Sequence, residues 1–124
     1  MPLSHFHPII QDWFRGRFEK PTEAQALGWP AIAQGRHTLI AAPTGSGKTL
    51  AFSIPIVERC DPKVRGVQAI VLVPTRELAI QVGGVLSTLA AARHLQFTLL
   101  YGGRGYNPER NALARGAQIV VGTP

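Results

Sequence analysis

The sequence predicts an α/β fold, a parallel sheet with flanking helices. Short runs of β-branched and other apolar residues alternate along the chain with longer segments that have helical spacing. This alternation is typical of parallel sheets with right-handed crossovers. One junction between an expected strand and a helix is a glycine-rich loop, and ligands of such sheets bind at the carboxyl ends of strands. At 124 residues, the chain is long enough for one modest core, so we expect at most one domain, residues 1–124.

Two helices are expected at the N-terminal end. The first lies within residues 9–19, where apolar side chains share one helical face, and Gly16 closes it. The second begins with Thr22 as N-cap and has Gln25 at the capping-box position three residues later. Gly35 ends it.

The first expected strand leads into the glycine-rich loop. Residues 38–41 (Thr-Leu-Ile-Ala) are a short apolar run that predicts a buried parallel strand, and residues 50–58 predict an apolar helix. Between them, residues 41–49 read Ala-Ala-Pro-Thr-Gly-Ser-Gly-Lys-Thr. Glycines let this backbone curl so that successive amides point into one concavity, and a helix that starts near Gly47 adds its positive end. The stretch therefore predicts a site for a nucleoside triphosphate, against the alternative of a surface loop that happens to precede a lysine.

Two residues at the end of this loop have the most specific roles. Lys48 is expected to reach the β- and γ-phosphates, and the Thr49 hydroxyl is expected to ligate Mg²⁺. They are the candidate catalytic residues, and Thr49 is the candidate metal ligand. Ala42 stands where the pattern normally has glycine. The nucleotide-binding candidates of the loop are Pro43, Thr44, Gly45, Ser46, Gly47, Lys48 and Thr49.

Further strands and helices are expected after residue 60. The expected elements are strands at 67–73, 96–101 and 117–121, a helix that opens at 75–77 and a short helix at 108–116. Gly83 and Gly84 lie in the middle of the helix that opens at 75–77, where each glycine costs about 1 kcal/mol, so we expect a kink or close packing there. Polar segments follow every strand end, which places them at one edge of the sheet.

Charge and cysteine content favour a soluble protein with polyanionic partners. The chain has 13 Lys and Arg against 7 Asp and Glu, a net charge of +6, although ordinary solubility charge explains this excess equally well. The single cysteine, Cys60, excludes an internal disulfide and favours a reducing cytosol. No apolar run reaches ~18 residues, and the N-terminus is unlike a secretion signal. We therefore expect a cytoplasmic protein with no membrane partner.

In several segments the sequence resembles the superfamily-2 helicases, most closely the DEAD-box ATP-dependent RNA helicases. The matching residues, in family order, are Phe18, Pro21, Thr22 and Gln25 (Q motif), 41–49 (motif I), 74–79 (motif Ia), Gly102 and Gly103 (double-glycine motif), and Thr123 and Pro124 (start of motif Ib). Together they span about residues 18–124, and five motifs in order are far more specific than any one of them.

This resemblance implies a RecA-like half-domain of the P-loop NTPases that uses ATP and Mg²⁺. Phe18, Thr22 and Gln25 would then recognise adenine. For Gln25 the alternative is that its amide only completes the helix cap. The backbone of an RNA strand would lie on Pro74, Thr75, Arg76, Glu77, Gly102, Gly103, Arg104 and Thr123. None of these residues is expected to recognise a base. For Arg76 and Glu77 the alternative is a salt-bridged first helical turn.

The sequence also departs from the family pattern. Arg17 replaces the usual glycine before Phe18, and Ala24 precedes Gln25. The family's Asp-Glu-Ala-Asp motif and its second RecA-like domain, which carries an arginine finger, have no counterpart in these 124 residues. Phosphoryl transfer depends on positioning and charge stabilisation, so we expect weak nucleotide binding and little turnover by this chain alone, with the remainder of a helicase as its partner.

Several other functions stay open. The loop spelling also occurs in the large helicase-related and Ski2-like groups, some of which act on DNA. A P-loop kinase or a GTPase-like switch would not need residues 74–79, and a guanine-recognising Asn-Lys-x-Asp is absent. A non-enzymatic nucleic-acid-binding module would leave an unpaired apolar sheet edge, so we expect the isolated chain to aggregate or dimerise.

Overall fold

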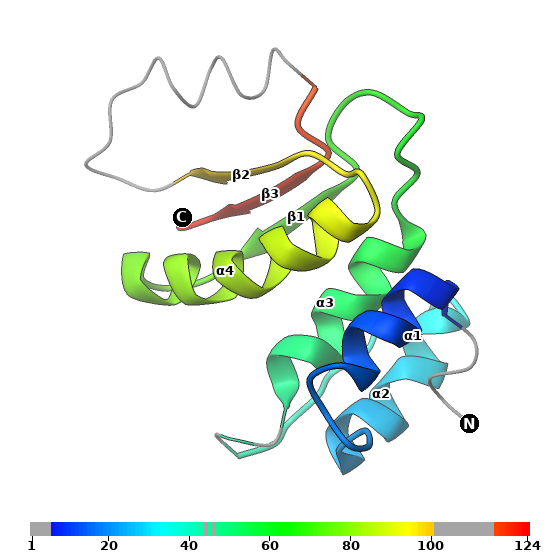
Figure 1. Cartoon of the computed structure of the whole chain (residues 1–124). Coiled ribbons are helices and arrows are strands. Elements are labelled where there is room, and N and C mark those ends of the chain that lie inside the picture. Colours follow the sequence, from blue (N-terminus) through cyan, green and yellow to red (C-terminus); the bar gives the residue numbers. More distant parts are fainter. Residues whose placement is uncertain (1–5, 44, 46, 101–115) are drawn as a thin grey trace. The chain divides into compact units, whose positions relative to one another are not determined.

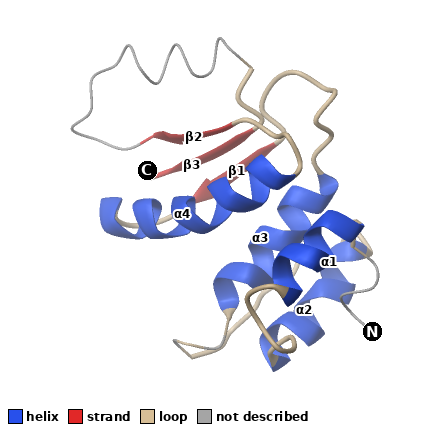
Figure 2. Ribbon diagram, viewed as in Figure 1, coloured by secondary structure: helices blue, strands red, loops and turns tan. Residues whose placement is uncertain are grey.

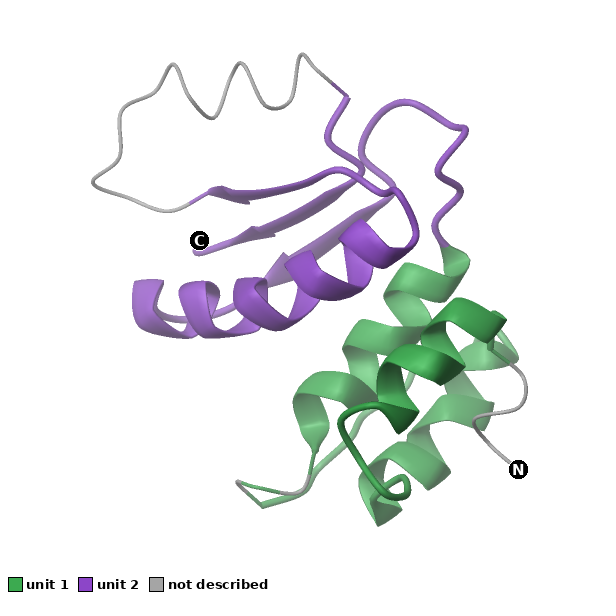
Figure 3. Cartoon of the chain, in the orientation of Figure 1, with its two compact units in different colours: residues 1–59 green, residues 60–124 purple. Residues whose placement is uncertain are grey.

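The computed structural model describes residues 6–43, 45, 47–100 and 116–124 (Figure 1). The chain forms two compact units, residues 1–59 and 60–124 (Figure 3). Among the described residues, the first unit is helical and the second holds the sheet (Figure 2). The elements are α1 (Pro8–Arg15), α2 (Glu23–Ala33) and α3 (Lys48–Arg59) in the first unit, and β1 (Ala69–Leu72), α4 (Arg76–Ala92), β2 (Phe97–Leu100) and β3 (Ile119–Gly122) in the second.

Helix α1 confirms the first expected helix in a shorter form. Its first residue is a proline, and the His7 imidazole caps it by accepting a hydrogen bond from the Ile9 amide at 3.1 Å. Gly16 is the C-cap, as its position predicted. The side chains of Ile10 and Phe14 are buried, so this face of the helix packs against the core of the first unit.

The predicted start of α2 is confirmed. Thr22 is the N-cap, and both hydrogen bonds of the capping box with Gln25 are present. The helix ends at Ala33, and Gly35 has a φ of +79°, a left-handed conformation that favours glycine. The cap and the stop predicted from the sequence therefore both hold.

The strand predicted at residues 38–41 is wrong. This segment has no strand assignment, and the Leu39 side chain is 94% exposed. Among the described residues, ladder hydrogen bonds join only β1, β2 and β3. An apolar run indicates that a segment is suited to a sheet, but a strand forms only where another backbone pairs with it. In the described part of the chain, residues 38–41 have no such partner.

In the second unit, the described strands form a three-stranded parallel sheet in the order β1-β3-β2. Leu72, Gly122 and Leu100 are in register at the carboxyl ends of the strands. The central strand β3 is buried along its whole length, so it forms the core of this unit. The parallel α/β prediction is confirmed with shorter strands. The helix expected at 108–116 lies outside the described residues except for Gly116, which is in a turn.

Strand β1 is less buried than the sequence predicts. Its residues alternate, and the side chains of Ile70 and Leu72 are 66% and 68% exposed. Ala69 and Val71 are half-buried. This alternation is typical of a sheet with one covered face, whereas the β-branched residues of segment 67–73 suit a buried strand.

The glycine pair of α4 fits the prediction of close packing at its first member. A Cβ atom built on Gly83 would lie 2.8 Å from Leu99 Cδ2 and 3.0 Å from Phe97 Cζ. Gly83 therefore lets α4 approach β2 (Figure 1). Gly84 is exposed, and a Cβ there would meet nothing within 4 Å.

Of the helices that the structure describes, none combines the length and the apolar character that crossing a membrane requires.

Candidate nucleotide-binding site

The glycine-rich loop leads directly into α3, as predicted. Gly45 and Gly47 have φ angles of +85° and +80°, which L side chains rarely adopt. Lys48 is the exposed first residue of the 12-residue helix, and Thr49 is half-buried beside it. Thr44 and Ser46 lie outside the described residues. Both candidate side chains, Lys48 and Thr49, therefore start from the end of α3 where the helix dipole favours a bound anion.

The Gln25 carboxamide joins the helix cap to this loop. Its Oε1 accepts a hydrogen bond from the Thr22 amide at 3.0 Å, and its Nε2 donates one to the Gly47 carbonyl at 3.2 Å. The side chain is 3% exposed. The capping interpretation of Gln25 is therefore confirmed. A carboxamide has two N–H groups and two acceptor lone pairs, so one of each stays unused by these bonds.

Gly47 is also required by its surroundings. A Cβ atom at this position would run into Gln25 Nε2 and would lie 2.9 Å from Thr22 Oγ1. The start of α2 and the end of the phosphate loop fit together only because residue 47 has no side chain. The close packing of Gly47 against the Thr22 and Gln25 side chains is consistent with a loop that folds around phosphate.

A hydrogen bond also joins α2 directly to α3, and the sequence predicted neither this bond nor that from Gln25 to Gly47. Trp29 Nε1 donates to the Leu50 carbonyl at 3.2 Å, in a buried environment. From the sequence alone, Trp29 is only an apolar residue of the helix that begins after Thr22, with no partner assigned to its N–H. Its spacing of four residues from Gln25 puts the two side chains on one helical face, which is the signal that could have identified it.

Phe18, another candidate adenine contact, has an exposed side chain, unlike Gln25. It is 44% exposed, and its ring centroid lies 5.1 Å from that of Phe14, with an angle of 35° between the planes. The Arg17 guanidinium lies 4.4 Å from the centroid of Trp13, a cation–π contact on the same segment. The Phe18 ring is therefore partly packed against other aromatic rings and partly accessible.

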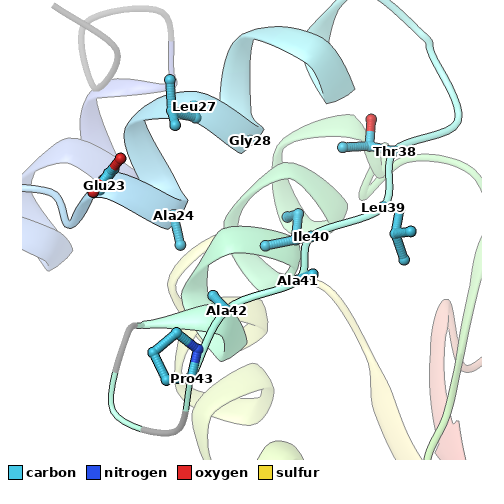
Figure 4. A pocket seen from close by; sticks show the side chains of 10 residues that line it. All are labelled: Glu23, Ala24, Leu27, Gly28, Thr38, Leu39, Ile40, Ala41, Ala42 and Pro43. Carbon is cyan, nitrogen blue, oxygen red and sulfur yellow. The ribbon is translucent and has the colours of Figure 1, made fainter.

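A hollow of about 470 Å³ lies beside this site, between α2 and residues 38–43 (Figure 4). Its walls are mostly apolar and include Leu27, Ile40 and Ala42, with Glu23 as the one charged side chain. Of the nucleotide-binding candidates that the structure describes, only Pro43 lines it. The hollow therefore adjoins the candidate phosphate site and does not contain it.

The candidate nucleic-acid contacts of the second unit gather at one edge of its sheet. Residues 74–77 follow β1 and Thr123 follows β3, so both segments leave the carboxyl ends of parallel strands. Thr75 is the N-cap of α4, with Oγ1 accepting from the Leu78 amide at 3.1 Å. Pro74, Arg76 and Glu77 are exposed, and Thr123 is half-buried. Gly102, Gly103 and Arg104 lie outside the described residues.

The position of Thr49 is compatible with the Mg²⁺-ligand role that the sequence predicts for it. Mg²⁺ bound to nucleotides keeps several waters and takes few protein oxygens, together with phosphate oxygens. A half-buried hydroxyl in the first turn of α3 suits that role. The described residues include no group of three or more His, Cys, Asp or Glu side chains that could hold a metal ion by themselves.

The fold and the glycine-rich loop together define the structural class of this domain. A parallel sheet with flanking helices, together with a glycine-rich loop that opens a helix at Lys48, is the architecture of a RecA-like P-loop domain. A DEAD box protein from the hyperthermophile Methanococcus jannaschii has a similar structure, with a TM-score of 0.88 and 40% identity over 96% of this chain and 33% of that chain. The Mycobacterium smegmatis helicase Lhr bound to ssDNA and AMP-PNP has a TM-score of 0.84 and 31% identity, over 99% and 17% of the two chains.

The family follows from the sequence comparison. The DEAD/DEAH box helicase family model matches residues 22–124, so the chain belongs to the DEAD/DEAH box helicase family. Among its relatives, the ATP-dependent RNA helicases DeaD of Escherichia coli (strain K12) and Klebsiella pneumoniae are 45% and 44% identical over 118 residues. These matches cover 94% of this chain but only 19% and 18% of the relatives.

Proposed function

We propose that this chain binds ATP with Mg²⁺ and contributes to the nucleic-acid contact of an ATP-dependent RNA helicase. The observation that supports this proposal best is the junction of loop and cap. Gly47 fits against Thr22 with no space for a Cβ, and its carbonyl accepts a hydrogen bond from Gln25. A loop fixed in this way presents Lys48 and Thr49 at the start of a helix, where phosphate groups bind favourably.

In this proposal each site residue has a separate role. Lys48 holds the β- and γ-phosphates, and Thr49 provides one oxygen ligand to Mg²⁺. The bound metal neutralises charge on the phosphate oxygens. Gln25 recognises the adenine edge with the N–H and lone pair that its capping contacts leave unused. The accessible part of the Phe18 ring packs against the base.

The proposed nucleic-acid contact is with the sugar–phosphate backbone. The candidate residues lie at one edge of the sheet, where Pro74, Thr75, Arg76 and Glu77 follow β1 and Thr123 follows β3. The start of α4 and a guanidinium are suited to phosphate oxygens and carry no base selectivity. RNA is proposed as the nucleic acid because the DeaD relatives are named as RNA helicases. DNA is the second candidate, since the similar Lhr structure is bound to ssDNA.

Strand separation is proposed for a longer protein only. The chain spans 18–19% of the length of the DeaD relatives, and an Asp-Glu-Ala-Asp sequence is absent from its 124 residues. Hydrolysis requires groups that orient water and stabilise the transferring phosphoryl group. We therefore propose that ATP turnover needs a second RecA-like domain and the carboxylates that accompany it.

Competition for a fluorescent ATP analogue tests the nucleotide site. We expect unlabelled ATP to displace the analogue at concentrations where GTP does not. Lys48→Ala should weaken binding by about tenfold or more, because a charge-assisted contact to phosphate contributes roughly 1.5–3 kcal/mol. Lys63→Ala is the matched control, since it removes the same charge from an exposed position in the other unit. Equal losses in the two variants, or a preference for GTP, would contradict the proposed site.

Salt titration tests the proposed nucleic-acid contact. Single-stranded RNA and DNA of one sequence should both bind more weakly as salt rises. Arg76→Ala should lower the slope of log K against log salt by about one, because one phosphate contact is lost. Arg36→Ala, an exposed arginine outside the candidate set, is the control and should leave the slope unchanged. If the two variants behave alike, the edge of the sheet is not the binding surface.

A further inference from the structure

We propose that Trp29 is a positioning residue for the phosphate site. Its indole N–H holds the first turn of α3 and thereby fixes the position of the Lys48 and Thr49 backbone. This inference rests on the proposed nucleotide site for its consequence, but the contact itself is a property of the free chain. Trp29 acts through the Leu50 carbonyl.

The contact is a buried hydrogen bond at a particular place in α3. Trp29 Nε1 lies 3.2 Å from the Leu50 carbonyl oxygen, and the Trp29 side chain is 1% exposed. Leu50 directly follows Thr49 and belongs to the first turn of the helix. In a low-dielectric environment such a bond is stronger than it is in water. The donor therefore restrains the backbone next to the candidate metal ligand.

The indole ring is itself fixed. The ring of Phe6 contacts Trp29 at a centroid distance of 5.1 Å and an interplanar angle of 87°, and Phe14 does so at 5.9 Å and 82°. Both are edge-to-face arrangements of the kind aromatic pairs prefer. The segment that carries Phe6 is joined to the other end of α3, where the His7 amide donates to Glu58 Oε2 at 2.9 Å. Rotation of the indole away from Leu50 would disrupt this cluster.

Among the described residues, Gln25 and Trp29 each donate a hydrogen bond from α2, the first to the residue before α3 and the second to its first turn. Gln25 and Trp29 are four residues apart on α2, and their acceptors, the carbonyls of Gly47 and Leu50, are three residues apart. The spacing on α2 places the two donor side chains on one helical face. A single bond would let the start of α3 pivot about Gly47, whereas two bonds fix its direction. Lys48 and Thr49 lie between the two acceptors in sequence, so their backbone is held on both sides.

The test compares Trp29→Phe with Trp13→Phe. Each variant keeps an aromatic ring and removes one indole N–H from the first unit. Trp13 Nε1 is buried but has no hydrogen-bond partner among the described residues, so Trp13→Phe is the matched control. In the nucleotide-free chain, Trp29→Phe should speed amide hydrogen exchange at residues 51–54, whose helical acceptors are carbonyls 47–50, by about two- to tenfold. Trp13→Phe should leave these amides unchanged.

The second measurement is affinity for ATP and for inorganic tripolyphosphate, which has no base. Trp29→Phe should weaken both by a similar factor of about two to ten, because the change affects the phosphate-binding residues. Trp13→Phe should stay within about twofold for tripolyphosphate. Unchanged exchange at residues 51–54 would overturn the positioning role, and so would altered exchange with unchanged affinity. If the wild-type chain bound neither ligand, the proposed function would fail, and the exchange data alone would decide whether Trp29 restrains α3.

Discussion

At the scale of single residues, the two loop glycines are required for different reasons. Both have positive φ angles, but only Gly47 is closed in by other groups, the side chains of Thr22 and Gln25. A Cβ at Gly45 would meet nothing within 4 Å. The sequence predicts both glycines from the phosphate-loop pattern. It does not predict that Gly47 serves the packing of α2 as well, because that contact depends on two segments 22 residues apart.

Alanine substitutions should separate these two requirements. Gly45→Ala places Ala in a left-handed conformation and should cost about 1–2 kcal/mol in the free energy of unfolding. Gly47→Ala should cost this and a further roughly 1–3 kcal/mol, because the new Cβ displaces the Thr22 and Gln25 side chains. Urea unfolding of both variants measures the difference. Equal costs would mean that the cap and the loop do not pack together as described.

The buried thiol of Cys60 predicts a pH dependence of stability. Burial raises the pKa of Cys60 above its ordinary value of 9.0, and the nearby Arg93 charge partly lowers it. The folded state therefore keeps this proton at a pH where the unfolded state has lost it. The stabilising contribution is complete below pH 9.0 and is lost as the pH rises towards and through the raised value.

Cys60→Ser removes this ionisation and tests its contribution. Wild-type stability should fall more steeply than that of Cys60→Ser as the pH rises above 9.0. All other ionisable side chains are common to the two proteins, so the comparison isolates the thiol. Parallel curves of unfolding free energy against pH would show that Cys60 is not protonated preferentially in the folded state.

At the scale of elements, the sequence identified helices better than strands. The ends of α1 and α2 followed from Gly16, Thr22 and Gln25, because helix caps are made by neighbouring residues. The strand expected at residues 38–41 failed because pairing depends on a distant backbone, which local hydropathy does not report. The Trp29–Leu50 bond was missed for a similar reason: an apolar position on α2 indicated burial but not the partner of its N–H.

The glycine pair of α4 gives an element-scale prediction with its own control. Gly84→Ala should stabilise the protein by about 0.5–1 kcal/mol, because the position is exposed, helical and unobstructed. Gly83→Ala gains the same helix propensity, but its Cβ would collide with Leu99 and Phe97, at a cost of about 1–3 kcal/mol. Thermal unfolding should therefore move in opposite directions in the two variants. A stabilising Gly83→Ala would mean that α4 lies farther from β2.

At the scale of the whole molecule, the described surface exposes several large apolar side chains. β1 is an edge strand of the described sheet, and Ile70 and Leu72 on it are both exposed. Leu39, on the extended segment before the phosphate loop, is more exposed still. Unpaired apolar strand edges favour association with other chains. This matches the expectation from the sequence that the isolated chain aggregates or dimerises, which stays a prediction.

Sedimentation velocity over a range of concentrations tests this prediction. The wild-type chain should show concentration-dependent association, and the double variant Ile70→Lys, Leu72→Lys should reduce it, because charged side chains on an edge strand oppose pairing. Ile80→Lys is the control, since Ile80 is 50% exposed but lies on α4. A wild-type chain that stays monomeric and melts cooperatively would contradict the prediction.

The aromatic cluster around Trp29 has an optical consequence. The chain has two tryptophans, Trp13 and Trp29, and both belong to residues 1–59. Indole emission therefore reports on that unit alone, whereas far-ultraviolet circular dichroism reports on the helices and strands of both. Coincident melting curves from the two signals would mean that residues 1–59 and 60–124 lose their structure as one cooperative body. Separate curves would give each half of the chain its own melting temperature without any added label.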